Sequence, residues 1–432
     1  MNSIRDLNLD YMCVGCGACA CICPLDCINI LVSKGQFYPR VDENKCKKCG
    51  LCLSVCPGRE MRIEEMAKRL WPGNLVYPKI GSFLKTYIGY SNNQNIRFNS
   101  ASGGIATSLL IELLNEKYID GAVVVRMNSE NPVFPETFIA RTVEEIESAQ
   151  SSKYCPTSML TVLKELKNNK KDEKLALVGL PCQIYAFRKL AEKNKVLSKK
   201  IILTLGLFCS HGVTFAGTQA LLNKFAKGAD NIYKIQWRGR GWPGGVAIKY
   251  KNKKEYFIDL ERYWPPFFAP YFFTPYRCLS CSDLAAETAD VSLGDAWLKE
   301  IKQKDNMGTS IVIVRSETAK VFLEKIKDKG GIFLENLSID KVIESQQGIL
   351  SRKKVTVGAR MKLLKFFKKP VPQIDGYFKE LKFKYSFGAF LIFLNAAISK
   401  SILFRKLIVK VPIRILRRYS GLVLCHSKGN HK

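Results

Sequence analysis

The chain has 432 residues, which is too long for one small domain and predicts two or three structural units. Hydrophobic residues make up 47% of the sequence, which supplies a sizeable core and excludes an intrinsically disordered chain. The net charge of +30 makes anionic cofactors, anionic lipid and nucleic acid the candidate partners of such a chain.

The 16 cysteines point to metal sites rather than to disulfide bonds. The first ten residues lack the apolar stretch of a secretory signal peptide, so we expect a cytoplasmic, reducing location. In a reducing compartment, regularly spaced cysteines are typical of metal binding.

Two copies of the pattern C-x2-C-x2-C-x3-C-P occur near the N-terminus. In two-cluster ferredoxins, the first three thiolates of one motif and the fourth thiolate of the other hold each [4Fe–4S] cluster. Cys21 and Cys27 fall outside the pattern, and we expect them to be unligated. Zinc is the alternative metal, but the doubled motif with proline after each fourth cysteine favours iron–sulfur clusters. The first cluster is expected at Cys13, Cys16, Cys19 and Cys56, and the second at Cys46, Cys49, Cys52 and Cys23.

The segments between and after these motifs complete a bacterial-type ferredoxin module over residues 1–75. Residues 28–32 and 37–41 flank Ser33-Lys34-Gly35 and predict a hairpin. Residues 60–80 predict a short helix followed by a linker.

Residues 80–360 predict a mixed α/β domain, because short apolar runs alternate with segments of helical periodicity. The predicted strands are 121–126, 175–179, 201–208, 289–293 and 311–315. The predicted helices are 104–117, 141–149, 157–169, 184–194, 214–227 and 317–329.

A second set of cysteines lies in this domain. Cys182 and Cys209 each follow a predicted strand, and Cys278 and Cys281 form a C-x-x-C pair. Open α/β sheets bind ligands at the carboxyl ends of their strands, so these four thiols are candidates for a third four-thiolate site. A lone C-x-x-C also fits zinc or redox chemistry, and Cys155 is a fifth candidate.

Several other stretches fit an anionic or planar ligand. Ser102, Gly103 and Gly104 precede a predicted helix, which fits either a phosphate site or an ordinary helix cap. Lys153 and Tyr154 place a cation beside an aromatic ring, which suits a flavin, a phosphate or a surface loop. Asp295 follows a predicted strand and is a candidate partner for a ribityl or ribose hydroxyl. The loop 237–245 fits a planar ligand, an RNA base or a hairpin, and His211 is either structural or close to the third metal site.

The tail, residues 376–432, is basic and amphipathic, with 12 Lys or Arg residues and one acidic residue. Its longest uncharged run, 385–399, is shorter than the roughly 20 residues of a membrane-spanning helix. Two interpretations stand side by side: peripheral contact with the inner face of a membrane, or a basic helix packed on protein. Because the charge excess is concentrated here, nucleic acid is the weaker candidate partner.

Seven separated motifs resemble those of the coenzyme F-420 hydrogenase/dehydrogenase beta-subunit family. They are ASGGIATSLL (101–110), SKY (152–154), GLPCQ (179–183), GLFCSHG (206–212), RGRGWPGG (238–245), RCLSCSD (277–283) and ADVSLGDAW (289–297). The resemblance covers residues 80–360 and implies a domain that binds FAD and a third [4Fe–4S] cluster. It implies that the cluster is held by Cys182, Cys209, Cys278 and Cys281, and that the FAD lies near Ser102, Gly103, Gly104, Lys153, Tyr154, Gln183 and Asp295.

The resemblance implies an oxidoreductase that relays electrons between its clusters and FAD and on to or from a small organic substrate. Coenzyme F-420 is one acceptor used in the family, and bacterial members with this layout are often associated with surface-polysaccharide biosynthesis. The alternative function is a non-catalytic electron-transfer subunit whose partner holds the substrate site. Both functions require a redox partner protein such as a ferredoxin.

Overall fold

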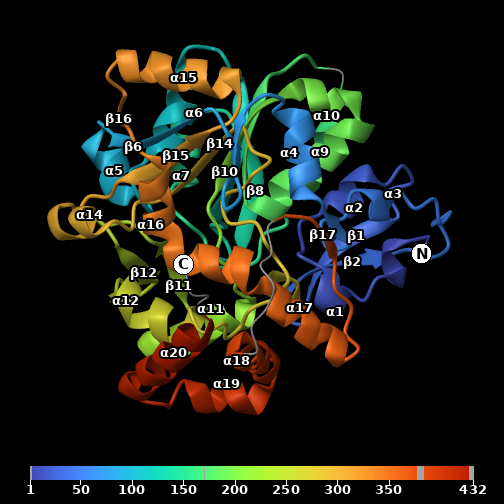
Figure 1. Ribbon diagram of the computed structural model, residues 1–432, viewed down its shortest axis with the longest axis vertical. Coiled ribbons are helices and arrows are strands. Elements are labelled where there is room, and N and C mark those ends of the chain that lie inside the picture. Colours follow the sequence, from blue (N-terminus) through green and yellow to red (C-terminus); the bar gives the residue numbers. More distant parts are fainter. Residues whose placement is uncertain (1, 170, 377–383, 428–432) are drawn as a thin grey trace.

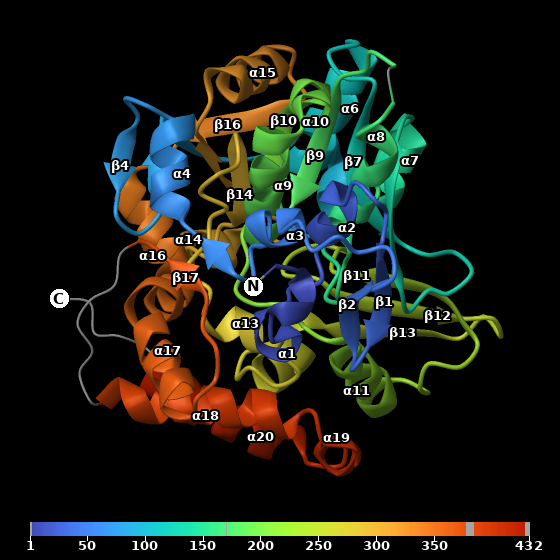
Figure 2. The ribbon, with the colours of Figure 1, turned by 90° about the vertical axis from the view of Figure 1, so that its right-hand side faces the viewer.

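The structure is a computed structural model that describes residues 2–169, 171–376 and 384–427. Residues 377–383 and 428–432 of the predicted tail lie outside this described part. The cysteine-rich N-terminal segment lies beside a large sheet covered by helices, and the C-terminal helices form one end of the molecule (Figures 1 and 2). The mixed α/β architecture predicted from the sequence is therefore present, and three unpredicted strands enlarge its sheet.

The main sheet of the described chain has eight strands in the order β16-β6-β15-β14-β10-β9-β7-β8. Neighbouring strands β14, β10, β9 and β7 run parallel, and antiparallel strands extend the sheet on both sides. The parallel arrangement brings the carboxyl ends of β9, β10 and β14 to one edge. The strand bounds are β6 Lys85–Ser91, β7 Gly121–Met127, β8 Pro135–Ala140, β9 Leu175–Gly179, β10 Ile201–Leu207, β14 Val291–Asp295, β15 Ser310–Val314 and β16 Ile332–Asn336.

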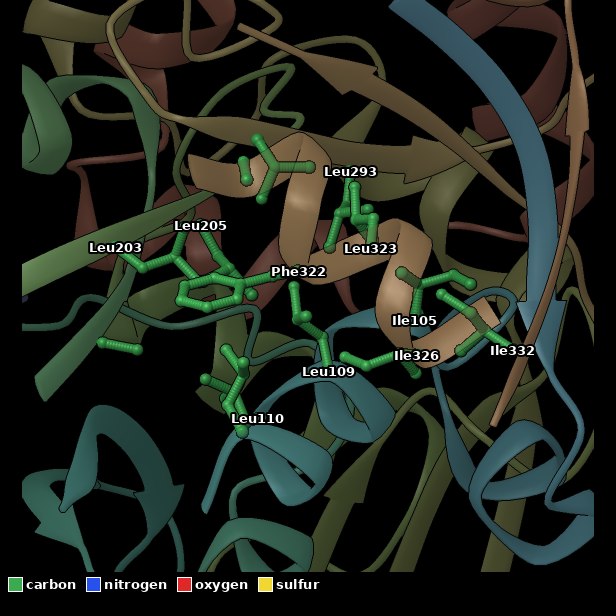
Figure 3. Close-up of a cluster of buried hydrophobic side chains, with 14 of the residues drawn as sticks. Ile105, Leu109, Leu110, Leu203, Leu205, Leu293, Phe322, Leu323, Ile326 and Ile332 are labelled. Atoms are coloured by element: carbon green, nitrogen blue, oxygen red, sulfur yellow. The ribbon is translucent and has the colours of Figure 1, made fainter. Parts of the chain in front are cut away.

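Helices α6 (Ile105–Asn115) and α15 (Glu317–Asp328) cover one face of this sheet. Leu109 of α6 and Leu323 of α15 lie against Leu203 and Leu205 of β10 in one buried cluster (Figure 3). Burying a Leu side chain contributes about 2 kcal/mol, so this apolar layer fixes the positions of the strands. Short helices α5 (Gln94–Asn99) and α7 (Val143–Ser148) add the buried side chains of Ile96 and Ile146 to this layer, whereas α14 (Lys299–Lys304) packs in another cluster.

The opposite face carries α9 (Pro181–Lys193), α8 (Leu163–Leu166), α10 (Lys195–Lys200) and the N-terminal segment. Cys16, Ala18 and Val55 of that segment share a buried cluster with Leu177 of β9 and Phe187 of α9. The ferredoxin-like segment is therefore built into the core of the α/β part. Its elements are η1 Ile4–Asp6, α1 Leu9–Met12, α2 Ala18–Ile22, β1 Ile28–Ser33, β2 Gln36–Val41, α3 Leu51–Ser54, β3 Glu60–Met61 and α4 Ile63–Leu70.

A smaller antiparallel sheet of β11 (Ile232–Trp237), β12 (Gly245–Tyr250) and β13 (Glu255–Asp259) packs with α11 (Phe215–Phe225). Loop 238–244 joins β11 to β12, which agrees with the hairpin interpretation of that motif. The remaining elements of this half are α12 Leu260–Tyr263, the π-helical turn Trp264–Phe268, α13 Tyr276–Leu279, α16 Ile339–Leu350, the π-helical turn Ser351–Val355, α17 Val357–Phe366 and β17 Gln373–Ile374.

The C-terminal helices are α18 (Lys384–Ile398), α19 (Ile402–Ile408) and α20 (Ile413–Ser427). Ile392 and Asn395 of α18 are fully buried, and Asn395 donates a hydrogen bond to the carbonyl oxygen of Pro270 at 2.7 Å. α18 therefore packs on the protein, which is one of the two interpretations of the tail. In the described chain, no single helix is long and apolar enough to cross a membrane. The helices Tyr385–Ile398 and Ile402–Ile408 together have the required length and composition, but the chain bends by 105° between them.

The predicted strands and helices of residues 80–360 are found within a few residues of their expected ends, with two differences. Residues 157–169 form a 3-10 turn, Met159–Thr161, and the short helix α8 instead of one helix. β14 runs to Asp295, so this acid lies in the strand rather than after it. Strands β6, β8 and β16 were not predicted, because β6 and β16 pair with strands distant in the chain and β8, which pairs with the nearby β7, begins with polar residues.

Candidate functional site: three cysteine sets and a cavity

Cys13, Cys16, Cys19 and Cys56 lie within electrostatic range of one another. Gly15 and Gly17 have positive φ values, 72° and 85°, which turn the backbone around the thiols. The N–H of Gly15 donates to Sγ of Cys13 at 3.3 Å. Burial raises the pKa of Cys13 to about 12. The structure thus brings together the four cysteines predicted for the first cluster.

The second set contains a residue that sequence reasoning set aside. Sγ of Cys27 lies 3.3 Å from Sγ of Cys23 and also neighbours Cys46. Burial and these neighbouring sulfurs raise the pKa of Cys27 to about 12. Cys52 is a neighbour of Cys49 and accepts a hydrogen bond from the N–H of Ile4 at 3.3 Å. Cys27 is therefore a fifth cysteine beside the set predicted for the second cluster.

Cys21 lies apart from both sets, because its side chain belongs to the apolar cluster beneath α9. In the part of the chain that the structure describes, no three His, Cys, Asp or Glu side chains converge as around one metal ion. The thiolates of a cubane each bind a different iron, so they stand farther apart than the ligands of a single ion.

The third cysteine set lies at the carboxyl edge of the parallel strands. Cys182 is the second residue of α9, directly after β9, and Cys209 follows β10. Cys278 lies in α13, and Cys281 follows it after a tight turn. Cys209, Cys278 and Cys281 are electrostatic neighbours of Cys182, whose pKa burial raises well above the ordinary value. Four cysteines separated by up to 99 residues in the sequence are thus brought together.

A buried lysine lies beside this third set. Lys353 is 2% exposed and belongs to the π-helical turn Ser351–Val355, which sequence reasoning did not single out. Burial raises the pKa of Cys281, but the neighbouring charges of Lys353 and Arg277 outweigh burial and hold it below the usual value. A fixed positive charge at four thiols suits a cluster that carries net negative charge.

The three sets form a sequence in space. Cys182 of the third set has Cys16 of the first set among its electrostatic neighbours, and Cys19 of the first set has Cys52 of the second. Cys49 of the second set is exposed to solvent, whereas Cys182 is half-buried and neighbours a cavity-lining residue, Cys209. The order from the surface inward is therefore second set, first set, third set, cavity.

The cavity has a volume of about 520 Å³, which is within the range of small-molecule and cofactor sites. It lies at the carboxyl edge of β9, β10 and β14, where an open α/β sheet binds ligands. Cys209 and His211 line its side toward the third cysteine set. Burial lowers the pKa of His211 to about 3, so its ring is neutral near pH 7. Its Nε2 lies 2.9 Å from the carbonyl oxygen of Phe268, an oxygen that can only accept.

Six of the seven residues predicted to contact a flavin line this cavity: Ser102, Gly104, Lys153, Tyr154, Gln183 and Asp295. Gly103 differs, because its N–H donates to Oγ of Ser310 at 2.9 Å and a β-carbon there would meet the carbonyl oxygen of Gly89 at 2.5 Å. Gly103 therefore permits close packing against the sheet. Gly104 caps α6 with φ of 79° and leaves the helix N-terminus facing the cavity.

Two of these polar side chains are already engaged. Nζ of Lys153 donates to the carbonyl oxygens of Gln150 at 2.8 Å and Ser151 at 3.0 Å. Asp295 accepts, through Oδ1, from Arg238 at 2.8 Å and from the indole N–H of Trp242 at 2.7 Å. Asp295 thus holds the buried guanidinium of Arg238 in place, in addition to its predicted role as a partner for a ribityl or ribose hydroxyl.

Arg238 is the main cavity residue that sequence reasoning did not assign a role. It is 3% exposed, donates to Tyr154 Oη at 3.0 Å, and has a buried Nε without a hydrogen-bond partner in the described structure. Nε of Arg352, which also lines the cavity, is likewise buried without a partner there. Such unpaired donors are costly unless a ligand accepts from them, so the cavity fits a large polar cofactor. The glycine-rich RGRGWPGG motif was the available sequence signal for Arg238.

Family models match the chain in the order in which the sites occur. A 4Fe-4S binding domain matches residues 39–59. The N-terminal and C-terminal models of the coenzyme F-420 hydrogenase/dehydrogenase beta subunit match residues 86–164 and 172–340. The chain belongs to this beta-subunit family. As a family member, it carries all seven resembling motifs within or beside the matched residues.

Two similar proteins are named after coenzyme F-420. The chain is 26% identical to the coenzyme F-420-dependent sulfite reductase of Methanocaldococcus jannaschii, over 78% of this chain and 49% of that protein. The chain thus spans about half the length of that relative. It is 27% identical to the coenzyme F-420 hydrogenase subunit beta of Methanothermobacter thermautotrophicus, over 64% of this chain and 97% of that subunit.

A solved structure has a similar fold. It is a chain of the F-420-reducing [NiFe] hydrogenase complex from Methanosarcina barkeri. It superposes with a TM-score of 0.55 at 20% identity, covering 69% of this chain and 99% of that chain.

Proposed function

We propose that this beta-subunit-family member is an iron–sulfur electron-transfer subunit of a larger oxidoreductase. In this proposal, three [4Fe–4S] clusters connect a surface site to a flavin in the cavity. The observation that best supports this proposal is the spatial order of the three cysteine sets, which leads from exposed Cys49 to cavity-lining Cys209. Relatives named as hydrogenase beta subunits support the subunit role over that of a self-sufficient enzyme.

The surface end of this path fits an acidic redox protein. Lys45, Lys47 and Lys48 are exposed around Cys46 and Cys49. A cluster of lysines steers partners that carry the opposite charge and accelerates their encounter. An acidic ferredoxin, or an acidic face of a partner subunit, is therefore the proposed electron donor or acceptor at the second cluster.

The cavity end fits FAD, because its unpaired donors and the α6 N-terminus offer positive potential to a diphosphate and hydrogen bonds to a planar ring. A bound flavin supplies the junction between one-electron and two-electron chemistry. The residues of this chain would bind and orient it: Asp295 fixes Arg238 and Trp242, and neutral His211 separates the cavity from the C-x-x-C loop. Ser102, Gly104, Lys153, Tyr154 and Gln183 complete the proposed contacts.

The proposal divides the chain into a ferredoxin-like unit at residues 1–75, a flavin and iron–sulfur unit at 80–360, and the tail at 376–432. The two-electron substrate, with coenzyme F-420 as the family example, belongs to the complex as a whole. The proposal does not extend to surface-polysaccharide biosynthesis, because no side chain described for the cavity is specific to that process.

Anaerobic reconstitution followed by iron, sulfide and flavin assays tests the proposal. We expect three clusters and one FAD per chain, with the flavin reduced only when the clusters are reduced. Fewer than three clusters, or no bound flavin, would contradict it. Turnover of an organic substrate by the isolated, reduced chain would instead support a self-sufficient enzyme.

A further inference from the structure

The C-terminal helices expose large apolar side chains at the end of the molecule farthest from α15 (Figures 1 and 2). On α19, Ile402, Leu403 and Leu407 are 69%, 67% and 52% exposed. On α20, Ile415 and Leu422 are 56% and 45% exposed, and their spacing of seven residues puts them on one helix face. Scattered single apolar residues are common on surfaces, but a group on two adjoining helices marks an interaction site.

The same helices carry an unbalanced positive charge. Residues 385–427 contain seven Lys or Arg residues and no Asp or Glu. Lys406 of α19, Lys410 in the turn between α19 and α20, and Arg414 and Arg418 of α20 are exposed. By helical periodicity, Lys406 lies between Ile402 and Leu407, and Arg418 lies between Ile415 and Leu422. Cations and apolar side chains are therefore interleaved on one surface, which we call the tail surface.

The tail surface is held rigidly by the opposite sides of its helices. Ile408 and Leu416 are 2% and 5% exposed and belong to the core beneath the small sheet. Nζ of Lys224 donates to the carbonyl oxygens of Val409 and Val411, at 2.7 and 2.8 Å, and fixes the turn between α19 and α20. The outward-facing apolar residues are therefore not what holds these helices in place, and their exposure needs another explanation.

We propose that the tail surface docks the protein on a membrane of anionic phospholipid, with α19 and α20 lying in the plane of the interface. An interfacial helix combines buried apolar side chains with Lys and Arg that contact lipid phosphates. With only seven residues, α19 is too short to cross a bilayer but long enough to insert its side chains.

The composition of the tail surface argues against a second copy of this chain and against nucleic acid as its occupant. Two copies of a face with exposed cations and no acidic residue repel each other, which opposes a dimer through this surface. Nucleic acid would satisfy the cations but would leave the five apolar side chains exposed, since its backbone offers charge rather than hydrocarbon. An anionic bilayer provides both phosphate and hydrocarbon.

Vesicle co-flotation of the full-length holoprotein tests this proposal. The probes are phosphatidylcholine vesicles and vesicles of phosphatidylcholine mixed with an equal part of phosphatidylglycerol. We expect binding to the anionic vesicles and a loss of about tenfold or more in the variant carrying Ile402→Ser, Leu403→Ser and Leu407→Ser. A variant with Lys406→Gln and Lys410→Gln should lose roughly fivefold for each charge removed.

The matched control is Leu75→Ser with Val76→Ser, because these side chains on β4 (Leu75–Tyr77) are 68% and 63% exposed but lie away from the tail surface. Retained cluster absorbance and circular dichroism show that each variant is folded. The proposal is overturned if the wild type ignores anionic vesicles, or if the triple variant binds them as well as the control. It is also overturned if sedimentation shows a dimer that the triple variant dissociates.

Discussion

Nη2 of Arg277 donates to the carbonyl oxygen of Pro57 at 2.7 Å, and its Nε donates to that of Gly58 at 3.2 Å. Arg277 is 1% exposed and directly precedes Cys278 of the third set, while Pro57 directly follows Cys56 of the first. One guanidinium therefore joins the loops of two proposed clusters. This contact fixes the separation across which an electron would pass.

Replacing Arg277 by Met should slow electron transfer from the first cluster to the third while all clusters remain bound. The substitution leaves two buried carbonyl groups unpaired, at a cost of about 1–3 kcal/mol each, so the loops separate. Freeze-quenched EPR spectroscopy after rapid reduction measures the transfer. Arg360→Met is the matched control, because Arg360 is also buried and donates to the carbonyl oxygen of Leu279 beside Cys278, while its described hydrogen bonds go to residues outside the ferredoxin-like segment. Equal rates in the two variants would refute this role.

Cys23 and Cys27 should behave differently when each is replaced by Ala, although their sulfurs lie 3.3 Å apart. The C-x3-C-P spacing assigns Cys23 as the ligand, so Cys23→Ala should lose one cluster and Cys27→Ala none. Iron content and EPR spin counts measure the difference. If Cys27→Ala loses a cluster and Cys23→Ala retains it, Cys27 is the true ligand and the pattern has misled the assignment.

Replacing Lys353 by Met should lower the reduction potential of the third cluster. Reduction adds negative charge, and a buried cation beside Cys281 stabilises the reduced form, so its removal favours the oxidised form. We expect a shift of tens of millivolts, where about 60 mV corresponds to a tenfold change in a one-electron equilibrium. An EPR-monitored redox titration measures it. Lys353→Arg preserves the charge and should leave the potential close to that of the wild type.

The affinity for FAD should fall as pH rises through neutrality. Burial lowers the pKa of Lys153 to about 7, so the side chain carries a positive charge below that pH and loses it above. A charged ammonium attracts the flavin diphosphate, whereas the neutral amine does not. Equilibrium dialysis of deflavinated protein between pH 6 and pH 8 measures the effect. The Lys153→Met variant should bind FAD weakly at every pH in this range. If its FAD affinity keeps the pH dependence of the wild type, another group is responsible for the titration.

The sequence alone determined the local parts of this protein. The spacing of each C-x2-C-x2-C-x3-C-P motif places three thiols on one turn of chain, whatever surrounds it. The apolar runs at 121–126, 175–179 and 201–208 likewise predicted β7, β9 and β10, because a buried parallel strand needs continuous apolar residues. The family was also recognisable, since its motifs are short and contiguous.

Only the tertiary structure decided which distant residues meet. Cys27 lies off the motif, yet the fold of the chain after Cys23 brings the two sulfurs together. Arg277 and Arg238 lie within recognised motifs and Lys353 lies outside them, but the contacts of all three join segments far apart in the sequence. Such contacts follow from the packing of the sheet and helices, in which each side chain's neighbours come from other elements. The proposed ligands of the first two clusters thus follow largely from local spacing, whereas the third cysteine set, the surrounding charges and the cavity are properties of the assembled fold.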